Sequence, residues 1–145
     1  MPDHIMAERS SEQPPPRVVE LKAKVLAADA ILLCTSEYNY SIPGVLKNAI
    51  DWASRPSGDS AWTAKPVAVM GAAAGVLGSA RAQYHLRQTF IFLEMYPVNR
   101  PEVFIGSAAT KFDERGELKD ETARDLIRQL LEKLVAWTRR LGATA

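Results

Sequence analysis

Two short apolar segments decide the fold class of this sequence: residues 30–34 and residues 66–70. Neither segment alternates apolar with polar residues, so both faces of each predicted strand are expected to be buried. That pattern is typical of strands in a parallel sheet covered by helices on both faces. Apolar residues at helical spacing follow each segment, over residues 43–53 and 79–93. The sequence therefore predicts an α/β protein with a parallel sheet.

The remaining segments extend this alternation along one domain of 145 residues. Residues 1–16 are polar and end in three prolines, which predicts a tail or linker before a core of residues 17–145. A first helix is expected from Pro16, and a third, weaker strand over residues 95–98 and 103–105. Residues 110–118 are predicted to be a charged loop, and residues 120–141 a strongly amphipathic helix.

Composition excludes several classes of protein. Lysine and arginine total 18 against 17 acidic residues, and this net charge of +1 does not favour nucleic-acid binding. No apolar segment approaches the roughly 18 residues of a membrane helix. The single cysteine, Cys34, cannot form an internal disulfide or a multi-cysteine zinc site. It is interpreted as a small buried residue at a strand end, in a protein of the reducing cytoplasm. The carboxylates form no metal-ligand cluster, and no metal is expected.

Two loops follow the predicted strands and are candidates for ligand binding. Ligands of open parallel sheets bind beyond the carboxyl ends of the strands. Residues 35–42 are rich in hydrogen-bonding and aromatic side chains, and residues 71–78 contain three glycines. Together they suit a flat ring with a polar edge; the alternative is a pair of ordinary loops whose glycines serve only the turns. The chain has no glycine-rich nucleotide motif, and Glu37 would oppose a phosphate.

The sequence at these loops resembles the NAD(P)H-dependent FMN reductase family. Residues 37–52, which read EYNYSIPGVLKNAIDW, are similar to the family signature and especially to its bacterial quinone and chromate reductase branch. Residues 78–88 and 99–103 resemble two further motifs of that branch. The resemblance implies a flavodoxin-like, three-layer α/β/α fold, bound FMN, and assembly into a homodimer or homotetramer.

The resemblance also implies which residues form the site. One group would bind the cofactor, and it comprises Ser36, Glu37, Tyr38, Asn39, Gly71, Ala72, Gly75 and Gly78. Ser36 replaces the proline usual in the family. Another group would border the substrate opening or join two dimers, and it comprises Arg81, Tyr84 and Glu102. Backbone N–H groups of residues 37–39 are expected to hydrogen-bond the ring. No side chain is assigned as a catalytic acid or base.

The front of the family domain has no counterpart in this sequence. The family begins with a strand, a phosphate-binding Gly-Ser-x-Arg-x-x-Ser loop, a helix and a second strand, none of which occurs here. The expected fold is therefore an N-terminally truncated flavodoxin-like domain. In the flavodoxin-like strand order, residues 30–34 would then form a sheet edge.

The expected function is that of an FMN-dependent oxidoreductase. NADPH or NADH would supply electrons, and a quinone, chromate, azo compound or free flavin would accept them. An alternative is a flavin-free or weakly binding relative that acts as an oligomeric interaction protein, since the phosphate loop is missing. A flavodoxin-type electron carrier fits less well, because such carriers tend to be acidic and this chain has a net charge of +1.

Overall fold

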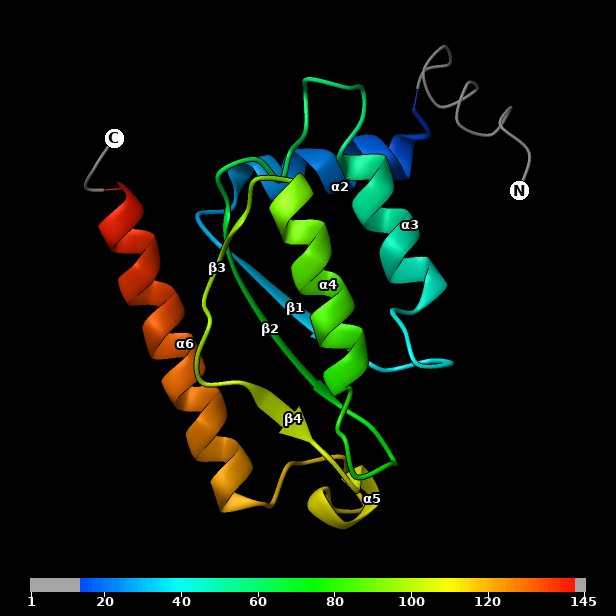
Figure 1. Cartoon of the computed structure of the whole chain (residues 1–145), viewed down its shortest axis with the longest axis vertical. Coiled ribbons are helices and arrows are strands. Elements are labelled where there is room, and N and C mark those ends of the chain that lie inside the picture. The colour runs from blue at the N-terminus through cyan, green and yellow to red at the C-terminus, as the bar shows by residue number, and fades with distance from the viewer. Residues whose placement is uncertain (1–13, 143–145) are drawn as a thin grey trace.

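The computed structural model describes residues 14–142. Most of the predicted tail, residues 1–13, lies outside the described residues, and the first helix begins at Pro16. In chain order the elements are α2 (Pro16–Ala27), β1 (Ile31–Thr35), α3 (Gly44–Ala53), β2 (Pro66–Ala72), α4 (Ala80–Phe92), β3 (Tyr96–Pro97), β4 (Val103–Ile105), α5 (Ala108–Lys111) and α6 (Glu121–Gly142). The predicted alternation of helices and strands is confirmed (Figure 1).

The sheet is parallel, and β2 lies at its centre. On one side β2 pairs with β1, from Ile31 opposite Val67 to Thr35 opposite Gly71. On its other side β2 pairs with β3 and, further along, with β4. The third predicted strand is thus split into two pieces. Pro101 lies between them and lacks the N–H group that a continuous ladder would need.

Helices cover the two faces of the sheet and produce three layers. Val67 and Val69 of β2 pack with α3 and α4 on one face, where Leu86 and Phe90 are fully buried. The other face packs against α6, whose buried Leu130 belongs to a second apolar cluster. In Figure 1, α6 runs alone on its side of the strands, apart from α3 and α4.

Strand β1 differs from the sequence prediction. Its three aliphatic residues, 31–33, are half-buried rather than buried, and Cys34 is exposed, so the interpretation of Cys34 as a buried residue is wrong. Among residues 14–142, β1 pairs only with β2, and α6 packs mainly over β2 and β4. Burial on both faces therefore holds for the central β2 but not for β1, which lies at the sheet edge as expected.

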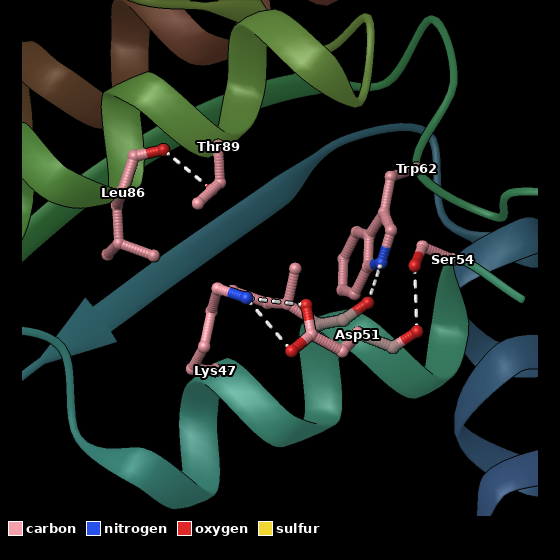
Figure 2. Close-up of polar contacts among 7 residues, drawn as sticks. Lys47, Asp51, Ser54, Trp62, Leu86 and Thr89 are labelled. Atoms are coloured by element: carbon pink, nitrogen blue, oxygen red, sulfur yellow. Dashed lines mark hydrogen bonds and ion pairs between the residues drawn. The ribbon is translucent and has the colours of Figure 1, made fainter. Parts of the chain in front are cut away.

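Helix α3 is fixed in place by the chain that follows it. The indole N–H of the buried Trp62 donates to the Ile50 carbonyl oxygen at 2.9 Å. Figure 2 shows this contact beside the bond from the Ser54 hydroxyl to the Asp51 carbonyl oxygen and the Lys47–Asp51 ion pair along the helix.

Two further observations concern the described residues as a whole. Within residues 14–142, no helix is both long and apolar enough to cross a bilayer. The same residues contain no group of three or more side chains suited to hold a metal ion.

The predicted charged loop over residues 110–118 contains some regular secondary structure. Helix α5 extends into it, and an isolated antiparallel β-bridge joins Phe112 to Leu118.

Candidate functional site

The two predicted ligand loops begin side by side. Thr35 and Gly71 are Cα partners at the carboxyl ends of β1 and β2, so the chain leaves both strands at the same end of the sheet. We call residues 36–42 the first loop and residues 73–78 the second loop. Both loops lie beyond the carboxyl ends of the strands, which is where open parallel sheets bind ligands.

The first loop contains a tight turn. The N–H of Tyr38 donates to the Ser41 carbonyl oxygen at 3.0 Å, and the reverse bond measures 2.9 Å. Asn39 and Tyr40 between them have φ values of 48° and 68°, so the turn is of the I′ type. A tyrosine in this left-handed region is uncommon, and such backbone strain clusters at functional sites. The turn leaves the Tyr38 and Tyr40 side chains exposed.

Glu37 ties the first loop to the start of α4. Its side chain is only 6% exposed. The carboxylate accepts the backbone N–H of Arg81 at 3.0 Å, that of Ala82 at 3.3 Å, and the Arg81 Nε–H at 2.5 Å. Burial raises the pKa of Glu37, but the hydrogen bonds from Arg81 and Ala82 outweigh it and hold the pKa below its usual range. Glu37 is therefore an ionised anchor with its donors in α4.

The second loop is held against the end of β4. The Ala73 N–H donates to the Ile105 carbonyl oxygen at 3.0 Å, and the Ser107 N–H donates to that of Gly75 at 3.1 Å. Gly78 has a φ of +55°, and a Cβ there would lie 2.6 Å from the backbone of residues 104 and 105. A Cβ on Gly71 would overlap the Thr35 carbonyl oxygen and the Ser79 hydroxyl.

The four predicted cofactor residues of this segment differ in burial and in the space around them. Gly71 and Gly78 are buried and allow backbone segments to approach each other closely. Ala72 is half-buried at the end of β2. Gly75 lies at the exposed tip of the second loop, and a Cβ added there would have nothing within 4 Å. Of the four, Gly75 is therefore the residue whose backbone is open to a ligand.

Backbone N–H groups of both loops are available to a ligand. Among residues 14–142, the N–H groups of Ser36, Glu37 and Asn39 have no acceptor, and neither do those of residues 74–77. The N–H of Tyr38 is used inside the turn, which departs from the expectation that residues 37–39 all donate to a ring. An isoalloxazine ring carries acceptor atoms along one edge, so this donor set fits the ring of FMN.

The three residues expected at the substrate opening or between dimers occupy different settings. Arg81 is bonded to Glu37 of its own chain, and its guanidinium lies 3.5 Å from the Tyr40 ring centre. Tyr84 is half-exposed and packs edge-on against Phe104, with 6.0 Å between ring centres. Glu102 is half-buried just before β4.

One contact near the site was missed by the sequence analysis. His85 is exposed, and its Nδ1 lies 2.9 Å from the Ser41 hydroxyl oxygen. The two residues are 44 positions apart, and no local pattern links them. The first loop therefore contacts α4 at both Arg81 and His85.

Comparison with known proteins identifies the family. The family model described as NADPH-dependent FMN reductase matches residues 2–110. An NAD(P)H-dependent FMN reductase of Pseudomonas aeruginosa is 56% identical over 127 residues, which cover 88% of this chain and 68% of that protein. The chain belongs to the NADPH-dependent FMN reductase family. The family is one of oxidoreductases that use FMN with NADPH or NADH, as the sequence motifs predicted.

Two further relatives support this assignment. A 2-hydroxy-1,4-benzoquinone reductase of a Burkholderia species is 42% identical over 118 residues, covering 81% of this chain and 64% of that protein. The flavoenzyme FerB of Paracoccus denitrificans, an NAD(P)H:(acceptor) oxidoreductase, is 34% identical and superposes with a TM-score of 0.80 over 97% of this chain and 74% of its own. The flavodoxin-like fold is thereby confirmed. The chain spans about two thirds of the length of the two curated relatives.

Proposed function

We propose that this chain carries electrons from NADPH or NADH to a quinone or a similar small acceptor, with FMN as its cofactor. The observation that carries the proposal is the pair of adjoining loops whose backbone N–H groups are available at the ends of β1 and β2. The names of the quinone-reducing and FMN-reducing relatives support this substrate class.

FMN, when bound, supplies the redox chemistry by taking up a hydride and releasing electrons to the acceptor. The chain's own residues bind the cofactor and orient its ring. The N–H groups of Ser36, Glu37 and Asn39 would donate to the ring edge and favour negative charge there. Tyr38 would add aromatic contact area, and the exposed backbone at Gly75 would approach from the second loop. No side-chain acid or base is required.

We further propose that the chain works as a homodimer or homotetramer in the cytoplasm. The family resemblance implies that Arg81, Tyr84 and Glu102 would border a second dimer, and the half-exposed side chain of Tyr84 is compatible with such a contact. An exposed, free Cys34 suits a reducing compartment. Neither nucleic acid nor a membrane is needed as a partner.

NADPH consumption with benzoquinone as acceptor tests the function. We expect the purified chain to oxidise NADPH only when FMN and benzoquinone are both added, at a rate above that of FMN without protein. Tyr38→Ala should require more FMN for the same rate, because it removes ring-contact area. A rate equal to that of free FMN would reject the proposal. A colourless protein of defined oligomeric mass would then favour the flavin-free interaction protein instead.

A further inference from the structure

The first loop is connected to α4 by three side-chain contacts. Glu37 accepts N–H groups from Arg81 and Ala82, Arg81 stacks on Tyr40, and Ser41 bonds to His85. All three come from the first turns of α4, a helix that is itself anchored by the fully buried Leu86 and Phe90. The conformation of the loop is thus set by a rigid helix rather than by the loop alone.

We propose that Glu37 and Arg81 form an intrachain brace that positions the first loop for FMN, so that the Glu37 carboxylate serves α4 and not the ring. The inference rests on the proposed function, since it concerns the same loop. It changes the role expected for Glu37, which the family resemblance places among the residues lining the ring. Only the backbone N–H of Glu37 remains for the cofactor.

The burial and bonding of Glu37 support this role. A carboxylate that is 6% exposed must be compensated by donors, and all of its donors in the structure belong to residues 81 and 82. Two of these donors are N–H groups at the start of α4, where the helix dipole favours a negative charge. A carboxylate committed in this way cannot also turn toward a ring without leaving those groups unpaired.

The stacking of Arg81 on Tyr40 links the brace to the strained turn. Tyr40 holds a φ of 68°, and its exposed ring has the Arg81 guanidinium 3.5 Å from its centre. Cation–π contact of this kind is favourable even at exposed sites. Arg81 therefore contacts Glu37, which precedes the strained turn, and Tyr40, which lies within it. Its role is assigned within its own chain and not only at a contact between dimers.

A double-mutant cycle on the 145-residue chain tests the brace. The variants are Glu37→Gln, Arg81→Gln and the combination, with FMN affinity measured by flavin fluorescence. Charged hydrogen bonds of this kind support an expected loss of about tenfold for each single variant. Because the two residues act as one unit, the double variant should bind no more weakly than either single variant. Lys47→Gln, which breaks an exposed ion pair on α3, is the matched control and should leave affinity unchanged.

Amide hydrogen exchange of the ligand-free chain separates this inference from the proposed function. The Tyr38 and Ser41 N–H groups, bonded across the turn, should exchange about tenfold faster in Glu37→Gln, while the Leu130 amide of α6 stays as protected as in the wild type. Arg81→Lys, which keeps the charge but not the planar fork, should show the same effect if Glu37→Gln does not fold.

The outcomes are distinct. If the wild type does not bind FMN but the exchange result holds, the proposed function fails and the brace stands as a loop anchor. Additive losses of FMN affinity in the cycle would overturn the inference. So would unchanged exchange at Tyr38 and Ser41 in both brace variants, because the loop would then keep its shape without the brace.

Discussion

Replacement of Gly78 by alanine should destabilise the protein more than the same change at the exposed loop glycines. Gly78 ends the second loop with a φ of +55°, a left-handed conformation that costs a residue with a Cβ about 1–2 kcal/mol. The new Cβ would also lie 2.6 Å from the Ile105 backbone N and from the Phe104 carbonyl C. Both atoms belong to the main chain of β4, so no side chain can rotate away. Overpacking of this kind costs about 1–3 kcal/mol.

Two matched glycines separate strain from overlap. Gly116 has a φ of +79° with nothing within 4 Å of an added Cβ, and Gly75 has the same open space without a positive φ. Gly116→Ala should therefore cost only the strain, about 1–2 kcal/mol. Gly75→Ala should change stability by less than about 0.5 kcal/mol. Gly78→Ala combines both effects, and the sum is about 2–5 kcal/mol.

Urea denaturation followed by far-ultraviolet circular dichroism measures these differences, with the slope of the transition checked for each variant. The expected order of destabilisation is Gly78→Ala, then Gly116→Ala, then Gly75→Ala. The reasoning is refuted if Gly78→Ala loses no more stability than Gly116→Ala. In that case the second loop would not be packed against β4 as the structure describes.

Three further predictions concern other parts of the chain. Asp120 caps α6 by accepting the Ala123 N–H at 2.8 Å, and the hydrogen bond from Lys111 lowers the pKa of Asp120. Asp120→Ala should therefore lower the urea concentration at the midpoint of unfolding. The contribution of Asp120 to the free energy of unfolding is present above the ordinary aspartate pKa and is lost as pH falls through its lowered pKa. A loss of stability in Asp120→Ala that did not change with pH would contradict this reasoning. Cys34 should react with a maleimide in the folded protein, slowly at neutral pH and faster as pH rises, because partial burial of the thiol raises its pKa. Reaction only in urea would contradict the exposure of Cys34. Glu102→Ala should shift a tetramer toward dimers in light scattering, and an unchanged mass would remove that residue from the interface.

The sequence predicts the layout of the fold because local patterns determine it. Two uninterrupted apolar segments identify β1 and β2, and helical spacing identifies α3, α4 and α6 to within a few residues. The meeting of the two loops follows from parallel pairing alone. Exposure of Cys34 does not follow from its neighbours in sequence, because it depends on which strand lies at the edge and where α6 crosses the sheet.

The side-chain partners at the site could not be predicted from the sequence. Glu37 and Arg81 are 44 positions apart, and only the packing of α4 beside β2 brings the residues together. The roles of the glycines depend equally on tertiary contacts. Gly75 and Gly78 are three residues apart in one loop, yet an added Cβ would meet β4 only at Gly78. Motif resemblance identified the segment that forms the site but not which of its atoms are already used by the protein.

FMN titration of the chain, with and without Tyr38→Ala, tests the central claim that the two loops hold a flavin ring. Flavin fluorescence should be quenched in a saturable way by the wild-type chain. Tyr38→Ala should bind several-fold more weakly, since an aromatic contact contributes about 0.5–1.5 kcal/mol beyond its burial. Absence of saturable quenching, or equal affinity in the two proteins, would contradict the placement of the ring at these loops.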